Sequence, residues 1–169
     1  ECGSKLYRIE GEANHYCLNC NGCKPQIIGR IQHYISRKAL DIEGLGQETV
    51  ALLVNANLIN NYSDLYELKF DQIVGLERMA EKSANNLIEG ILDSKNIPFE
   101  RVLYGLGIRY VGETVAKKLA KHFENIDNIL NSNFEELISV DEIGEKIANS
   151  IIEFSQNLEN IEIINSLKS

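Results

Sequence analysis

The stretch that decides the fold is Ile42-Glu43-Gly44-Leu45-Gly46-Gln47-Glu48-Thr49-Val50, where an apolar residue leads into Gly-x-Gly and a helix-patterned run follows. Two glycines two positions apart let the backbone turn sharply between helices, because glycine adopts positive φ without strain. The second helix then begins with backbone N–H groups that point out of the turn, and such donors suit a phosphate. Alone the motif is weak evidence, since many helix-to-helix turns contain glycine.

The turn recurs along the chain. Its third position holds Gly46, Ala80, Gly112 and Gly144, which lie 34, 32 and 32 residues apart by subtraction. The middle residue of each turn is apolar. A small residue four positions after the last turn position and an aliphatic residue three positions further on complete an i, i+4, i+7 stripe typical of an amphipathic helix. These small residues are Val50, Ala84, Ala116 and Ala148. Four copies at one period indicate a repeat architecture, with a plain helical stack for protein binding as the alternative.

The amino-acid composition limits the kinds of fold and function that the chain can have. The chain has 169 residues, 44% of them hydrophobic, and only two prolines, so it can hold one core or a few small ones without long disordered linkers. It has no run of 18 apolar residues, which favours a soluble intracellular protein, and the start at Glu1 without a Met suggests a piece of something longer. The formal net charge of −8 argues against generic nucleic-acid binding, which usually requires a basic face.

All four cysteines, Cys2, Cys17, Cys20 and Cys23, lie in the first 23 residues, with C-x2-C-x2-C spacing at the end. Two such knuckles can surround one tetrahedral Zn²⁺, and so small a segment would depend on the metal for much of its stability. A disulfide, free thiols and a ligand role for His15 are the alternatives. The alternation from Lys5 to Glu10 predicts a short strand between the knuckles.

The remainder predicts helices. In the first half, helices are expected over 27–40 and from Gln47 to about Ala56, with Asn57 as the C-cap. Short helical segments capped by Ser63-Asp64 and by Asp71 follow, and the second repeat ends near Leu92. In the second half, helices are expected over 99–106, over 113–123, over 134–139 behind Ser132 or Asn133, over 146–154, and in a closing helix within 157–169. Pro98 fits the first turn of a new helix. We therefore expect an all-α fold of four helix-turn-helix repeats in two pairs, 27–94 and 95–169, behind a cysteine-rich module over 1–26.

These residues resemble the zinc-finger and helix-hairpin-helix portion of bacterial NAD⁺-dependent DNA ligases, nearly end to end. The most specific string is Ser36-Arg37-Lys38-Ala39-Leu40-Asp41-Ile42-Glu43-Gly44-Leu45-Gly46 directly after Cys23-Lys24-Pro25-Gln26. Glu81 to Leu87 and Gly105 to Glu113 are similar to the family as well. The resemblance maps the zinc ligands onto Cys2, Cys17 and Cys23, places the remaining family cysteine just before residue 1, and leaves Cys20 as an extra cysteine that could replace it.

Three turns depart from the family pattern. Arg78, Tyr110 and Glu142 stand where the first glycine is expected, and Ala80 replaces the second glycine of its turn. Because an L-residue at positive φ costs roughly 1 kcal/mol or more, these turns are expected to differ in geometry or to hold phosphate more weakly.

The resemblance implies nick sealing in DNA replication and repair by the whole enzyme, which uses NAD⁺ and Mg²⁺ and carries a structural Zn²⁺. The adenylation motif Lys-x-Asp-Gly does not occur in this sequence, so the stretch alone is expected not to ligate. It would grip double-stranded, nicked DNA through the backbone without sequence preference, as a cytoplasmic, nucleoid-associated monomer beside the other ligase domains. Two other roles stay open: a scaffold that positions the catalytic domains, and a DNA-binding module of an excision nuclease subunit.

Local charge ranks the turns. The third has the most basic surroundings and is expected to be the best DNA contact, the second and first follow, and the fourth is expected to be mainly structural. The candidate DNA-binding residues are Arg37, Lys38, Gly44, Gly46, Arg78, Lys82, Arg109, Gly112, Lys117, Lys118, Lys121, Gly144 and Lys146.

Overall fold

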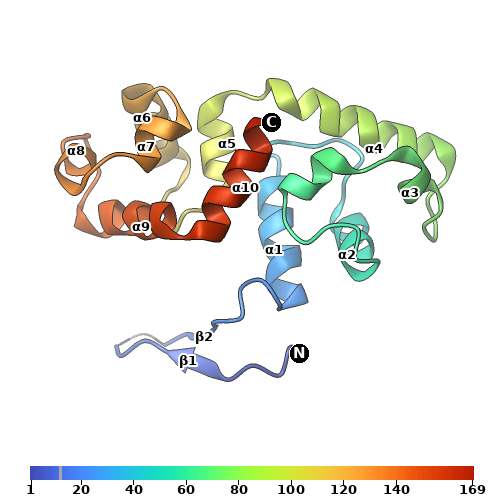
Figure 1. Cartoon of the computed structure of the whole chain (residues 1–169), viewed down its shortest axis with the longest axis horizontal. Coiled ribbons are helices and arrows are strands. Elements are labelled where there is room, and N and C mark those ends of the chain that lie inside the picture. The colour runs from blue at the N-terminus through green and yellow to red at the C-terminus, as the bar shows by residue number, and fades with distance from the viewer. Residues whose placement is uncertain (12) are drawn as a thin grey trace.

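The computed structural model describes residues 1–11 and 13–169, as an elongated helical body from which a small two-stranded sheet projects (Figure 1). The elements are β1 (Leu6–Arg8), β2 (His15–Cys17), α1 (Lys24–Tyr34), α2 (Gln47–Asn55), η1 (Ser63–Glu67), α3 (Phe70–Val74), α4 (Glu81–Asp93), η2 (Ser94–Asn96), α5 (Phe99–Gly105), α6 (Glu113–Phe123), α7 (Ile126–Leu130), α8 (Phe134–Ile138), α9 (Glu145–Gln156) and α10 (Leu158–Lys168). The predicted all-α repeat fold behind a cysteine module is confirmed.

In the described part of the chain the helices pair into four hairpins: α1 with α2, α3 with α4, α5 with α6, and α8 with α9. We number them hairpins 1 to 4. Helices α1 and α5 pack against each other at the centre of the body, with hairpin 2 toward one end and hairpin 4 toward the other (Figure 1). The closing helix α10 packs on α9 and reaches back to η1, so it joins the two halves.

The hydrophobic stripe that defines the repeat forms the core. Val50, Ala84, Ala116 and Ala148 are fully buried, and so are the aliphatic residues three positions later in each helix. Small residues at these sites let the two helices of a hairpin approach closely. A similar close approach places Gly90 of α4 against the first turn, where an added Cβ would lie 2.3 Å from the carbonyl oxygen of Glu43.

Several boundaries differ from the sequence prediction. Helix α1 begins at Lys24, since Pro25 fits a first turn, and ends at Tyr34 instead of residue 40. Beyond it the carbonyl of Ser36 accepts hydrogen bonds from the amides of Ala39 and Asp41, which closes a compact turn in place of a further helical turn. Asp71 lies inside the first turn of α3 and does not cap it; the cap position is Lys69.

The sequence prediction missed β2 and α7. The expected strand at β1 has an antiparallel partner, β2, paired in the register Leu6 with Cys17. Helix α7 follows Asn125, whose side chain accepts a hydrogen bond from the amide of Asn128 and so caps the helix. The C-cap of α2 is Ala56, one residue before the predicted Asn57, which follows the helix with φ 56°.

Side-chain contacts, besides the chain itself, attach the cysteine module to the body. Arg30 of α1 donates to the carbonyl of Cys20 and to the side-chain oxygen of Asn21, and the Asn21 amide donates to Glu159 of α10. No helix within residues 1–11 and 13–169 is long and apolar enough to span a membrane.

Candidate nucleic-acid interface and metal centre

The four hairpin turns share one backbone conformation. Gly44, Arg78, Tyr110 and Glu142 have φ values of 79, 64, 66 and 66°. In each turn the amide of the next residue donates to the carbonyl three positions earlier, at 3.4, 3.2, 3.0 and 3.0 Å in order along the chain. A left-handed residue at this place is the requirement of a type II turn. The expectation that the three turns without a first glycine differ in geometry is therefore wrong: they adopt the left-handed conformation despite the strain.

The third position of each turn is the N-cap of the following helix and is extended, with φ between −79 and −90°. Glycine is therefore not required there by backbone conformation. A Cβ added to Gly46, Gly112 or Gly144 would meet no atom within 4 Å. Neither strain nor packing against the described residues accounts for these glycines, and their lack of a side chain leaves the space beside the adjacent amides open.

The amides at these helix starts are available to a ligand. In the third turn the amides of Gly112, Glu113 and Thr114 donate to no acceptor within the described residues, and the first helical bond beyond them joins the Ala116 amide to the Gly112 carbonyl. Outer turn residues such as Tyr110 and Gly112 are exposed, while the middle residue Val111 is 6% exposed. The turns are thus anchored by their middle residues and present their outer backbone to solvent.

The basic candidates fall into two groups. Lys38 and Lys118 are held by carboxylates: the Lys38 amine lies 3.0 Å from Glu113, and the Lys118 amine lies 2.7 Å from Asp141 and 2.9 Å from Glu142. The hydrogen bonds that the two amines donate to these carboxylates, and then the negative charge of the carboxylates, raise the pKa of both lysines. Arg78 lies 3.9 Å from Glu77 with both side chains exposed, a weak pair.

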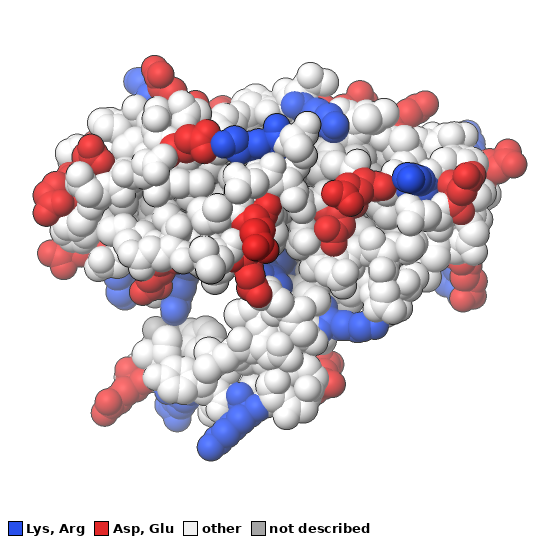
Figure 2. All heavy atoms as spheres, viewed as in Figure 1, with Lys and Arg blue, Asp and Glu red and all other residues white. Residues whose placement is uncertain are grey.

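The remaining basic candidates differ in their contacts. Within the described part of the chain, Lys82, Lys117 and Lys121 are exposed and make no ion pair. Lys146 lies over the ring of Tyr110, 5.5 Å from its centroid, and Arg109 lies 4.9 Å from the same centroid. Figure 2 shows acidic and basic side chains interspersed on the face in view, without a broad basic area there. The evidence for an anionic ligand therefore comes from the open amides and basic side chains at the individual turns, and not from a general basic surface on this face.

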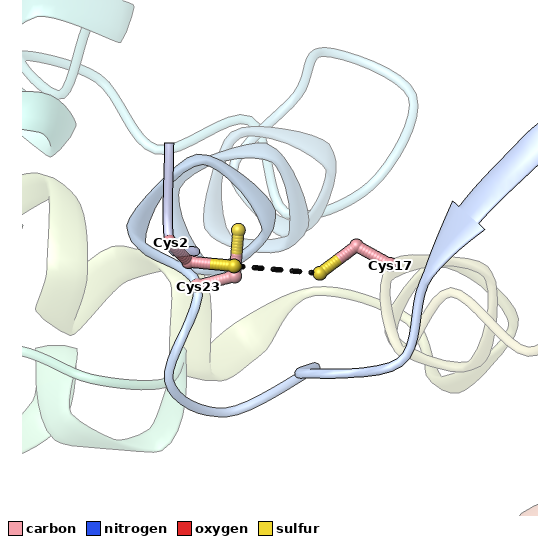
Figure 3. A group of neighbouring side chains, drawn as sticks. All are labelled: Cys2, Cys17 and Cys23. Atoms are coloured by element: carbon pink, nitrogen blue, oxygen red, sulfur yellow. Dashed lines mark hydrogen bonds between the residues drawn. The ribbon is translucent and has the colours of Figure 1, made fainter. Parts of the chain in front are cut away.

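Three of the four cysteines meet at one point (Figure 3). The sulfur atoms of Cys2, Cys17 and Cys23 all lie within 4.8 Å of one another, and those of Cys2 and Cys17 are 3.5 Å apart. Ligand sulfurs around a tetrahedral Zn²⁺ are separated by about 3.8 Å, given zinc–sulfur bonds of about 2.3 Å. The three thiols therefore fit a zinc site. The structure does not bring exposed Cys20 into this group, and His15 is outside it too.

The thiols favour a bound cation. Hydrogen bonds from the side chain and backbone of Ser4 lower the pKa of Cys2 to about 6. The backbone of Asn19 lowers the pKa of Cys17, but the hydrogen bond with Cys2, burial and neighbouring negative charge outweigh it and raise that pKa. A divalent cation among the sulfurs would relieve this repulsion, because zinc ligands bind as thiolates.

The chain is similar to two helix-hairpin-helix families and to known DNA ligases. Residues 36–93 match the family of SAM-like helix-hairpin-helix tandems, and residues 101–164 match the helix-hairpin-helix motif family. A DNA ligase of Flavobacterium psychrophilum is 68% identical over the whole chain, one of Bacteroides fragilis is 56% identical over the whole chain, and one of Cytophaga hutchinsonii is 52% identical over 99% of it. The chain corresponds to the helix-hairpin-helix region of bacterial DNA ligases. It spans about 25% of the length of these relatives.

Within this ligase region, sequence reasoning missed the contacts between hairpins. Ser150 of α9 donates to the carbonyl of Arg109 at 2.7 Å, and Arg109 lies 5.5 Å from the ring centroid of Tyr16 on β2. Arg109 therefore connects the third turn both to hairpin 4 and to the cysteine module. These partners are separated by many residues in sequence, and no local spacing rule pairs them; the aromatic Tyr110 directly after Arg109 was the one available signal.

Proposed function

We propose that the chain is the part of an NAD⁺-dependent DNA ligase that binds duplex DNA around a nick without sequence preference, in DNA replication and repair. The observation that carries the proposal is the set of open amides at the helix starts, beside glycines with free space above them. Phosphates bind at such helix N-termini, and backbone contacts of this kind carry no sequence information. The whole enzyme would use NAD⁺ and Mg²⁺ at sites outside this sequence.

The residues proposed to contact DNA are those at the exposed turns together with the basic side chains beside them. Lys117 and Lys121 on α6, with Gly112, make the third turn the strongest candidate. Lys118 ranks lower than its neighbours, because its amine already pairs with Asp141 and Glu142. Cys2, Cys17 and Cys23 would hold a structural Zn²⁺ that stabilises the cysteine module.

The test is binding of the chain to a labelled duplex, nicked and intact, measured by fluorescence anisotropy across a salt series. We expect affinity to fall linearly with salt on logarithmic axes and to vary little with sequence. Gly112→Val should weaken binding without unfolding the chain, because a side chain there would stand over the free amides but has room in the folded protein. No binding at about 50 mM salt and ~100 μM protein, a concentration typical of non-specific complexes, would contradict the proposal.

A second candidate role is a scaffold that positions the catalytic domains of the ligase while touching little DNA. The acidic net charge of −8 and the carboxylates that occupy Lys38 and Lys118 favour it. Lys117→Glu with Lys121→Glu separates the two roles: unchanged DNA affinity supports the scaffold, and a marked loss supports direct contact. We further propose that the chain acts as a monomer in the bacterial cytoplasm, close to the nucleoid.

A further inference from the structure

A hollow of about 330 Å³ lies between the segment that follows α1 and hairpin 3. Among the side chains that line it are Arg37, Lys38, Arg101, Lys117, Glu100 and Glu113. Four basic and two acidic groups leave a formal local charge of +2, against −8 for the whole chain. An excess of positive charge concentrated in a concave site of an acidic protein favours an anionic ligand.

The hollow is held together by contacts between distant parts of the sequence. The guanidinium of Arg101 on α5 donates to the carbonyl of Arg37 at 2.7 Å, which fixes the segment after α1 against hairpin 3. Glu113 is the first residue of α6, directly after Gly112, and Lys117 follows one helical turn later. The hollow is therefore continuous with the open amides of the third turn.

One anion already occupies part of this site. The carboxylate of Glu113 lies 3.0 Å from the amine of Lys38, and the two side chains are 44% and 66% exposed. An ion pair this exposed is weak and readily exchanged, because water and salt screen it. Another anion of suitable geometry can therefore compete for Lys38.

The equivalent positions of the other hairpins show that this pair is particular to hairpin 3. Gln47, Glu81 and Glu145 are the first residues of α2, α4 and α9, as Glu113 is of α6. In the part of the chain that the structure describes, neither Glu81 nor Glu145 pairs with a cation. An acidic residue at a helix start is ordinary, whereas the link from Glu113 back to hairpin 1 is not.

We propose that this hollow binds a backbone phosphate of the DNA strand, and that the Glu113 carboxylate holds Lys38 until the phosphate displaces it. The inference rests on the proposed function and adds to it a specific bridge between hairpins 1 and 3. A strand that lies over the open amides of Gly112 to Thr114 can continue past Lys117 to Lys38 and Arg37. Binding then exchanges one anion for another, so Glu113 weakens DNA binding by competing with it.

The experiment compares wild type, Glu113→Gln, Lys38→Met and the double variant, with Glu145→Gln as the matched control at the equivalent position of hairpin 4. Affinity for a short duplex is measured by anisotropy across a salt series, and circular dichroism checks folding. We expect Glu113→Gln to bind about two- to five-fold tighter, the range of a weak exposed ion pair. Its slope of log affinity against log salt should stay near that of wild type, because Lys38 neutralises the same phosphate in both proteins, whereas Lys38→Met should make the slope shallower by about 0.9. Glu145→Gln frees no partnered cation and should leave the affinity near that of wild type.

The double variant gives the decisive comparison. Without Lys38 the carboxylate has no partner to release, so Glu113→Gln should change affinity and slope no more than Glu145→Gln does. An equal effect of Glu113→Gln with and without Lys38 would overturn the inference while leaving DNA binding intact. Failure of wild type and all variants to bind duplex would overturn both this inference and the proposed function.

A titration with inorganic phosphate tests whether the hollow binds a DNA strand or a free anion. The amides of Gly112 to Thr114 and the Lys38 side chain are followed by NMR as phosphate is added. Shifts that saturate only with duplex support a strand site. Saturable binding of inorganic phosphate alone, together with duplex affinity insensitive to Glu113→Gln, would assign the hollow to a free anion and contradict the proposal.

Discussion

Gly44 and Gly46 lie two residues apart in the first turn, yet they meet different requirements. Gly44 has φ 79°, and a Cβ there would lie 3.2 Å from the backbone nitrogen of Leu87 in α4. Gly46 has φ −89° and open space around it. Backbone conformation and packing thus favour glycine at the first position, and neither does so at the second. The sequence pattern predicted both residues but could not separate their roles, because the Leu87 contact comes from a distant helix.

This contrast predicts opposite outcomes for matched substitutions. Gly44→Ala should lower the free energy of unfolding by about 1–2 kcal/mol, the cost of a left-handed L-residue, with the close contact to Leu87 adding to it. Gly46→Ala should cost less than about 1 kcal/mol, the scale of a changed N-cap. Arg78→Gly, at the position equivalent to Gly44, should stabilise the chain. Urea unfolding measures all three, and an equal loss for both alanine variants would contradict the assignment.

At the scale of elements, the repeat spacing predicted the features that depend on residues close together in sequence. The hairpin turns, α6, α9 and the cap of α8 at Asn133 lie where amphipathic stripes and capping residues placed them. The early end of α1 was not predictable from periodicity. Ile35, Ala39 and Leu40 are all buried, so their spacing continues the helical pattern although the backbone turns after Tyr34. Burial by tertiary packing, and not helix continuation, explains those apolar residues.

The ion pairs between hairpins could not be predicted from sequence either. One of them, between Lys118 and Asp141, should make the stability of the fold depend on pH. Lys118 of α6 lowers the pKa of Asp141 below its ordinary value of 3.8, by its hydrogen bond first and then by its charge. A carboxyl with a lowered pKa stabilises the fold above its unfolded pKa, and this contribution is lost as pH falls through the folded value.

Asp141→Asn should therefore lower the free energy of unfolding at neutral pH, where the pair between hairpins 3 and 4 is fully charged. The difference from wild type should shrink once the pH falls below 3.8 and vanish when Asp141 is protonated in the folded state. Urea unfolding at a series of pH values measures it. Glu153→Gln is the control, since this exposed carboxylate of α9 has no ion pair within the described residues. A constant difference at all pH values would show that the pair contributes nothing.

Across the whole molecule, two parts depend on different sources of stability. The buried core begins at Ile27 and runs through the hairpins to Ile164, while Cys23 is the one buried apolar residue before it within the described chain. The cysteine module therefore has almost no core of its own. Its attachments to the body, from Arg30 to Cys20, from Asn21 to Glu159 and from Arg109 to the ring of Tyr16, are polar and cation–π contacts that cannot replace one. The proposed metal binding by Cys2, Cys17 and Cys23 would supply the missing stability.

Removing the metal should consequently unfold the module and spare the hairpins. In zinc, trypsin should cut slowly at Lys5; after chelation, cleavage there should be rapid, while the far-ultraviolet circular dichroism of the helices changes little. Cys23→Ser should reproduce the chelated state in the presence of zinc, and Cys20→Ser, which alters the cysteine outside the cluster, should behave as wild type. If chelation also melted the helices, the cysteine module would be part of the folding core of the hairpin body. If Cys20→Ser released zinc, the fourth ligand would be Cys20, and the loop that carries it would have to close over the metal.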